Sequence, residues 1–181
     1  MKNVVLVGLL APALAFAAIG KIVLLEGKAT RTPEGGAAAE LKVGSDIELK
    51  DTLKVDGGNL KFELNDGSVI MLAPASALEI TEADFEGQER KGFSGLLKAG
   101  SLWTKVKKAL GGGKFEVSTE RAVAGVRGTI FRIDADALVK AAKGKGRKAS
   151  IVRVVEGSVA VNPSKAIARA FKKAAPKGPR V

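Results

Sequence analysis

Few side chains in this sequence could take part in chemistry. The 181 residues include no Cys, no His and no Tyr. Their absence excludes thiol nucleophiles, Ser–His–Asp triads, imidazole bases and the usual zinc sites. Asp134 and Asp136, two residues apart, could bind a cation or act as a glycosidase pair, but nothing else in the sequence supports such a site, and an ordinary strand-end turn explains them. We therefore predict a non-enzymatic protein without a catalytic residue, metal or cofactor.

Arg127 is the strongest single candidate for recognition. Its apolar neighbours Val126 and Ile130 predict that the stem of its side chain is partly buried. A buried guanidinium needs carboxylate or carbonyl partners. Arg127 could therefore contact the carboxylate or backbone of a partner protein, or it could be an internal clamp that ties two strands together beside Gly125 and Gly128.

Trp103 lies in a segment that alternates like a strand. Alternation puts Trp103, Lys105 and Lys107 on one face, opposite the residues between them. This face could contact a partner or stack on a sugar ring. Alternatively, Trp103 covers a second layer and the lysine stems pack over it.

The first 17 residues have the pattern of a secretory signal peptide. Lys2 precedes the apolar run from Val4 to Phe16, and Ala15-Phe16-Ala17 gives the small residues of a cleavage site after Ala17. An uncleaved anchor or a buried helix is the alternative, although a membrane span needs about 20 apolar residues. We therefore expect a bacterial protein exported by the Sec route to the periplasm or beyond, with no transmembrane span after cleavage.

The chain is strongly basic, with a formal net charge of +11. Outside the Trp103 segment, the candidate partner contacts are Lys143, Lys145, Arg147, Lys148, Arg169, Lys172 and Lys173. These cations could bind an acidic envelope protein or an anionic envelope polymer, or they could only aid solubility. The predicted leader argues against nucleic acid as the partner.

Residues 18–161 have the pattern of one all-β domain. Short alternating runs separated by glycine predict about 10–13 short strands, in a short irregular β-solenoid or a two-sheet sandwich. Open strand edges could allow self-association. Residues 162–181 predict a short basic helix and a tail, with Asn162 as the cap and Pro163 at the first helical position.

The segment from Arg121 to Ile133 closely resembles the signature of the FecR-domain family. The signature positions are Gly125, Val126, Arg127, Gly128 and Thr129. Further resemblance is carried by residues 20–29, 60–72, 97–106, 115–119 and 151–161, so that it covers about 20–161. The resemblance implies a β-rich, exported binding or signalling domain.

In the best-known members of that family, the domain is periplasmic and receives a signal from an outer-membrane transporter. A transmembrane helix joins it to a cytoplasmic anti-sigma segment. Here we expect only the leader to precede the domain, which favours a stand-alone binding or scaffold module. The alternative is a periplasmic sensor that works with a separate membrane partner.

Overall fold

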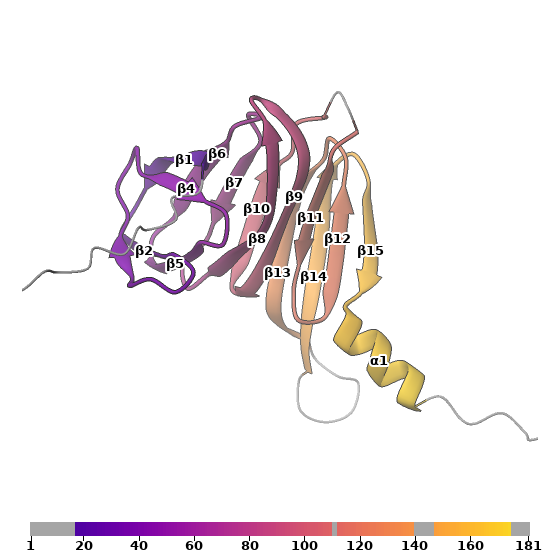
Figure 1. Cartoon of the computed structure of the whole chain (residues 1–181). Coiled ribbons are helices and arrows are strands. Elements are labelled where there is room, and N and C mark those ends of the chain that lie inside the picture. The colour runs from indigo at the N-terminus through magenta and orange to yellow at the C-terminus, as the bar shows by residue number, and fades with distance from the viewer. Residues whose placement is uncertain (1–16, 110–111, 140–146, 175–181) are drawn as a thin grey trace, which may run out of the picture.

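Alternating apolar and polar side chains form strands through most of the chain (Figure 1). The structure, a computed structural model, describes residues 17–109, 112–139 and 147–174. The first seven strands are β1 (Ala18–Leu25), β2 (Lys28–Thr32), β3 (Ala39–Glu40), β4 (Asp46–Glu48), β5 (Thr52–Gly57), β6 (Leu60–Leu64) and β7 (Val69–Leu72). They are followed by β8 (Ala77–Glu86), β9 (Glu89–Ala99), β10 (Ser101–Lys105), β11 (Lys114–Ser118), β12 (Ala122–Val126), β13 (Ile130–Val139), β14 (Arg147–Glu156), β15 (Val159–Pro163) and the helix α1 (Lys165–Ala174).

The all-β prediction is confirmed, and the two-sheet alternative is the one adopted. Sheet 1 has the strand order β14-β13-β10-β7-β6-β1-β4, and sheet 2 has the order β15-β12-β11-β9-β8-β5-β2-β3. Neighbouring strands are antiparallel except for β9 and β11, which are parallel. The described residues hold more strands than the sequence predicts, because β3 and β4 are too short to show alternation.

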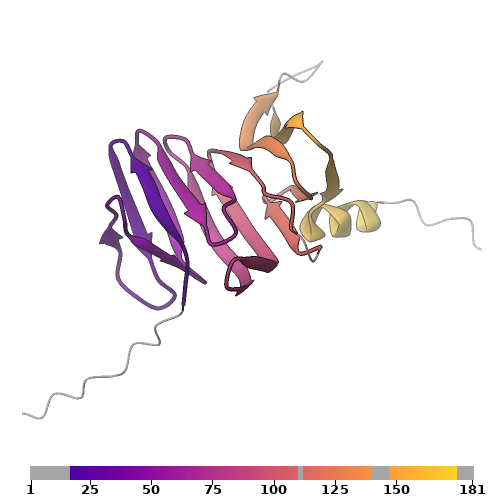
Figure 2. The ribbon, with the colours of Figure 1, turned by 90° about the horizontal axis from the view of Figure 1, so that it is seen from above.

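Both sheets advance along the molecule roughly in chain order. The N-terminal strands therefore lie at one end of the sandwich and β12 to β15 lie at the other, with α1 leading away beyond β15 (Figures 1 and 2). This progression explains why the sequence pattern is also compatible with a solenoid.

The core lies between the two sheets and follows the strand alternation. In β6, Leu60, Phe62 and Leu64 are buried, whereas the residues between them face outward. Phe93 of β9 stacks on Phe115 of β11 with ring centroids 4.8 Å apart. Antiparallel sheets that bury one face each give this inward apolar and outward polar pattern.

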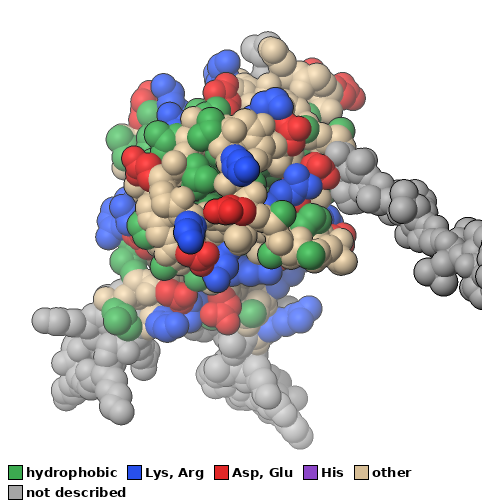
Figure 3. Space-filling view, turned by 90° about the vertical axis from the view of Figure 1, so that its left-hand side faces the viewer, with side chains coloured by type: hydrophobic (Ala, Val, Ile, Leu, Met, Phe, Trp, Pro, Cys, Tyr) green, Lys and Arg blue, Asp and Glu red, His purple; other side chains and the backbone are tan. Residues whose placement is uncertain are grey.

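The N-terminal end of the sandwich is closed. Ile47 and Leu41 are 0% and 3% exposed, so the core does not reach solvent there. Arg31 pairs with Asp51 and Glu48, each at 2.9 Å. Figure 3 shows cationic and anionic side chains interspersed over this end.

The predicted C-terminal helix is present, but its cap differs from the prediction. Asn162 and Pro163 belong to β15, which pairs with β12 as far as Pro163. Ser164 caps the helix instead: its hydroxyl accepts a hydrogen bond from the Ile167 N–H at 3.3 Å and donates one to the Glu120 carbonyl at 2.6 Å. The sheet thus holds the chain extended for two residues longer than local preference indicates, and the next residue able to cap begins the helix.

No helix in the described ranges has both the length and the apolar character needed to cross a bilayer.

Candidate functional site

The signature segment is a corner at which the chain passes from sheet 2 to sheet 1. β12, which contains Gly125 and ends at Val126, belongs to sheet 2, and β13 begins at Ile130 in sheet 1. Between them, Gly128 has a φ of 62°, and a Cβ built on it would lie 3.1 Å from the Cβ of Lys108. That φ strains any other residue, and the contact leaves little room for a side chain. Glycine therefore permits the crossing between sheets.

Thr129 fastens this corner to two other segments. Its side chain is buried, and its hydroxyl donates a hydrogen bond to the Ser158 carbonyl at 2.9 Å. Its carbonyl accepts a hydrogen bond from the Val106 N–H, also at 2.9 Å. Gly157, with a φ of 88°, closes the β14–β15 turn over the threonine. The signature thus joins the end of β10 to the last hairpin of the domain.

Arg127 is exposed at the corner, which differs from the partly buried stem that its apolar neighbours predict. The physical reason is its place at the crossing, where successive residues do not keep the alternation of a regular strand. A Cβ on Gly112 would lie 3.8 Å from Nη2 of Arg127. The residue that is buried and ties strands together, as expected of a clamp, is Arg90.

Among the described residues, Arg90 on β9 is the arginine with a fully buried side chain, and 1% of its surface is exposed. It forms an ion pair with Asp66 and donates hydrogen bonds to the Ser68 hydroxyl and the Lys107 carbonyl, each at 3.0 Å. Its Cζ lies 5.2 Å from the centroid of the Phe115 ring, a cation–π distance. Burial lowers the pKa of Arg90, and the nearby Asp66 carboxylate opposes this shift.

This network ties three parts of the molecule together. Asp66 and Ser68 lie in the β6–β7 turn of sheet 1, Arg90 comes from sheet 2, and Lys107 follows β10. The Ser68 hydroxyl also donates to Asp66 at 2.8 Å and accepts from the Lys107 N–H at 2.9 Å. A buried charge with such partners fixes the spacing between the sheets beside the signature corner.

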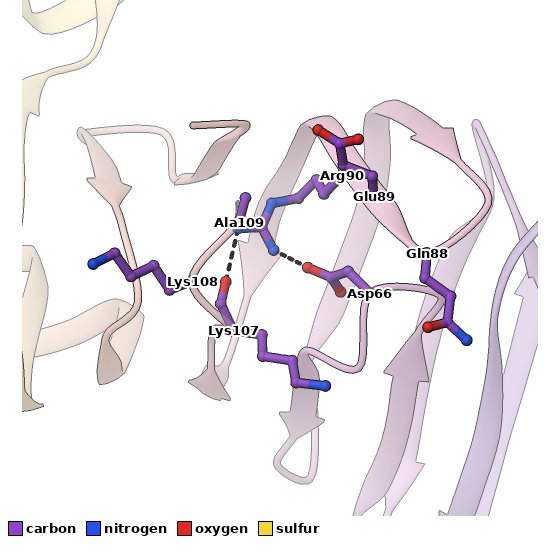
Figure 4. A pocket seen from close by; sticks show the side chains of 7 residues that line it. All are labelled: Asp66, Gln88, Glu89, Arg90, Lys107, Lys108 and Ala109. Carbon is purple, nitrogen blue, oxygen red and sulfur yellow. Dashed lines mark hydrogen bonds and ion pairs between the residues drawn. The ribbon is translucent and has the colours of Figure 1, made fainter. Parts of the chain in front are cut away.

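A hollow of about 440 Å³ lies over this network, with Gln88 and Glu89 among its lining residues (Figure 4). Arg90 and Asp66 point toward each other, whereas the side chains of Lys107 and Lys108 extend away from them. The two lysines therefore do not converge on a small ligand in the hollow. The arrangement fits a structural network with cations spread over the surface around it.

The surface beside the signature corner carries a group of cations, here called the cationic rim: Lys105, Lys107, Lys108 and Arg127. All four are exposed, and none makes an ion pair with a residue that the structure describes. The Gly128–Lys108 contact brings Arg127 to the lysines that follow β10. The rim is therefore a set of neighbouring exposed cations from separate parts of the sequence, and its Lys107 and Lys108 side chains point in different directions (Figure 4).

Trp103 lies on the outer face of β10 with Lys105, as strand alternation predicts. It is half-buried, and its cross-strand partners are Met71 on β7 and Arg132 on β13. Leu102 of the same strand is buried in the core. The indole thus lies on the outside of sheet 1, two residues before Lys105 of the rim on the same strand.

The other predicted cations do not join the rim. Lys143 and Lys145 lie outside the described residues. Arg147 begins β14, and Lys148 is exposed with its Nζ 3.7 Å from Asp136. On α1, Arg169 is exposed, and the side chains of Lys172 and Lys173 are outside the description. In Figure 1, the start of β14 and α1 lie at the end of the strands opposite the β14–β15 turn, so the predicted basic residues divide between two ends.

Asp134 and Asp136 do not form a shared carboxylate site. Asp134 accepts hydrogen bonds from Ser101, Arg132 and Arg153, whereas Asp136 makes ion pairs of its own. Burial raises the pKa of Asp134, but the hydrogen bonds from Ser101, Arg132 and Arg153 outweigh it and hold the pKa below its ordinary value. In the described part of the chain, no cluster of three or more acidic side chains could hold a metal ion.

Sequence reasoning missed Arg90, the residue at the centre of the network. It lies in the polar run Glu89-Arg90-Lys91, which has the pattern of a solvated turn. Register shifts along β8–β9 place Arg90 facing inward. The one available signal is Asp66-Gly67-Ser68, a turn with a carboxylate and a hydroxyl that can accept from a guanidinium, but it does not specify the donor.

The comparisons with known proteins agree with the signature. A family model described as FecR protein matches residues 51–160. No curated protein and no solved structure matches the chain. The matched range begins just before β5 and ends in β15, so it includes the Arg90 network, the rim and the corner but leaves out β1 to β4. It is shorter than the range of about 20–161 over which the sequence resembles the family. Because it spans more than half of the sequence, the chain belongs to the FecR protein family.

Proposed function

We propose that this chain is an exported, non-catalytic binding or scaffold module of the bacterial cell envelope. Membership of the FecR family relates it to cell-surface signalling. The module binds an acidic envelope protein or an anionic envelope polymer through the cationic rim. The observation that carries the proposal is the position of four exposed cations at the signature corner, none paired with a described carboxylate.

The rigidity of this surface supports a binding role. The backbone N–H and carbonyl of Lys107 are held by Ser68 and Arg90, Lys108 follows directly, and Arg127 lies two residues before the threonine that fastens the corner. The backbone beneath the rim is therefore ordered before a partner arrives, which reduces the entropy cost of binding. Each exposed ion pair contributes about 0.2–1 kcal/mol, so four such contacts give a moderate and salt-sensitive affinity.

Charge reversal on the rim tests the proposal. The variant K105E/K107E/K108E/R127E should lose co-sedimentation with purified envelope material, because its surface repels an anionic partner. Wild-type binding should weaken steadily as salt is raised. The matched control reverses Lys28, Lys42, Lys50 and Lys61, which lie in the N-terminal strands and loops away from the corner, and should bind as the wild type does. Wild-type binding that is indifferent to salt, or equal loss in both variants, would refute the role of the rim.

The start of β1 is compatible with export, which is part of the proposal. β1 begins at Ala18, the residue that follows the predicted cleavage point, so removal of the leader would leave the described fold whole. N-terminal sequencing of the protein from fractionated cells tests this step. A mature chain that begins at Ala18 in the periplasmic or secreted fraction is expected, and an intact Met1 in the cytosol would contradict it.

The family favours a second candidate, a periplasmic sensor that works with a separate membrane partner. A scaffold should bind envelope material under all conditions, whereas a sensor should bind one partner only when the inducing ligand is present. Pull-down from envelope extracts of cells grown with and without candidate inducers separates the two.

A further inference from the structure

The core of the sandwich reaches solvent at the β14–β15 end. The β13–β14 register pairs Val154 with Phe131, and the β12–β15 register pairs Val161 with Ala124. Directly paired residues in a sheet lie on the same face, and Phe131 and Ala124 are both 0% exposed. Val154 and Val161 therefore face the inside of the sandwich, yet they are 46% and 52% exposed.

Two further valines extend this apolar surface inward. Val152 pairs with Ile133, and Val159 pairs with Val126. Both are partly buried and pack against the core. The four valines define the open end of the sandwich: Val152, Val154, Val159 and Val161. Helix α1 leads away from this end (Figures 1 and 2) and leaves Val154 and Val161 exposed.

The two ends of the sandwich differ in how their edge strands are protected. At the N-terminal end, the edge strands β4 and β3 have only three and two residues, and they carry Asp46, Glu48 and Glu40. Cationic, anionic and apolar side chains are interspersed over this end (Figure 3). At the open end, β14 has ten residues and β15 has five, and among the described strands each pairs on one side only. Short, charged edges block strand addition, whereas a long apolar edge favours it.

We propose that two copies of this chain associate through their open ends about a two-fold axis. β14 of one copy pairs antiparallel with β14 of the other, so that sheet 1 continues across the interface and the valines of the open ends are buried. Because the edge strands at the N-terminal end have only two and three residues, a head-to-tail arrangement would pair β14 with a much shorter edge, and the assembly stops at a dimer.

Charge complementarity along β14 supports a second copy of the chain as the partner. An antiparallel pair centred on Val152 brings Lys148 near the start of each strand to Glu156 near the end of the other. A parallel pair in register would instead place Lys148 beside Lys148 and Glu156 beside Glu156 of the other copy, so that like charges face each other. Arg153 does not oppose the pairing, because it is engaged with Asp134 on the neighbouring strand, and Lys148, whose Nζ lies 3.7 Å from Asp136 of its own copy, would then lie between Asp136 and Glu156 of the other copy.

The test is the mass of the purified full chain, measured by sedimentation velocity over a broad range of concentration. The wild type should pass from monomer to dimer, and the V154K/V161K variant should weaken association at least about a hundredfold, because it forces two charges into an apolar interface. Both sites are already half-exposed in one copy, so the monomer should keep its circular dichroism spectrum. The control variant V23K/V43K adds the same charge at residues that are 43% and 63% exposed in the N-terminal part of the chain, and it should dimerise as the wild type does.

A charge exchange tests the direction of pairing. E156K should weaken the dimer, and K148E/E156K should restore it. A chain that is monomeric at all concentrations, a control that dissociates equally, or growth into open filaments would overturn the proposal. The rim-reversed variant K105E/K107E/K108E/R127E should still dimerise, so failure of this inference is distinguishable from failure of the proposed function.

Discussion

Replacing Arg90 by Met tests whether the buried guanidinium holds the two sheets together beside the signature corner. The substitution keeps an unbranched side chain of comparable length and removes the charge and the hydrogen-bond donors. Asp66, 6% exposed in its side chain, then remains as a buried carboxylate without its cation. The Lys107 carbonyl also loses a donor at 3.0 Å.

The expected loss of stability is large. Removing one partner of a buried ion pair costs about 3–5 kcal/mol, mainly through the charge left behind. The whole free energy of unfolding of a domain is about 5–15 kcal/mol. For a chain of this length, each kcal/mol lowers Tm by roughly 2–4 °C, so the midpoint should fall by about 6–20 °C.

Urea unfolding followed by fluorescence measures this change, because Trp103 is the sole Trp of the sequence. Lys54→Met is the matched control, since its ion pair with Asp56 is exposed and should contribute less than about 1 kcal/mol. Adding Asp66→Asn to Arg90→Met should recover at least about 1 kcal/mol, because this network then holds no unpaired buried charge.

The reasoning would be refuted if Arg90→Met and Lys54→Met had equal unfolding free energies with an unchanged denaturant slope. It would also fail if Asp66→Asn destabilised the Arg90→Met chain further, since the unpaired carboxylate would then not be the source of the cost.

Two further changes address the corner and its neighbouring strands. Gly157→Ala should lower the unfolding free energy by about 1–3 kcal/mol, because its φ of 88° is strained for alanine and the new Cβ would lie 2.9 Å from Thr129 Oγ1. A neutral effect in urea unfolding would argue against the close packing of the β14–β15 turn on Thr129. Asp134→Asn should cost about 1–3 kcal/mol at neutral pH, since charge-assisted hydrogen bonds to Arg132 and Arg153 are lost. The pKa of Asp134 is held below its ordinary value of 3.8 in the fold, so its contribution is present above that pH and is lost as pH falls through the folded pKa. The difference in stability between wild type and Asp134→Asn should therefore narrow in acid, and a gap independent of pH would contradict this account.

Much of the fold could be predicted because strand alternation is a local property. Leu60, Phe62 and Leu64 alternate in the sequence and are buried in the structure. The same rule placed Trp103 and Lys105 on an outer face. It could not find β3 and β4, since two or three residues show no period, nor choose between solenoid and sandwich, which share the same local pattern.

The candidate site was predicted only in part. The sequence predicts a glycine corner at the signature and leaves Arg127 as either a recognition residue or an internal clamp; in the structure Arg127 is exposed, and Arg90 is the buried guanidinium. Register shifts in β8–β9 decide the direction of Arg90, and register depends on pairing between strands. The polar residues around Arg90 do not indicate how β8 and β9 pair, so the inward direction of Arg90 could not be predicted from them.

The sequence by itself determined the chemistry that this chain can offer: strands, glycine corners and an excess of lysine and arginine, without a thiol or imidazole. Tertiary structure alone decided which charges are paired and which apolar residues remain exposed. Lys108 and Arg127 are brought together by a crossing between sheets, and Val154 and Val161 face inward but reach solvent because both sheets end beside them. The physical reason is that side-chain type and alternation are local, whereas desolvation and charge pairing depend on residues that are distant in the sequence.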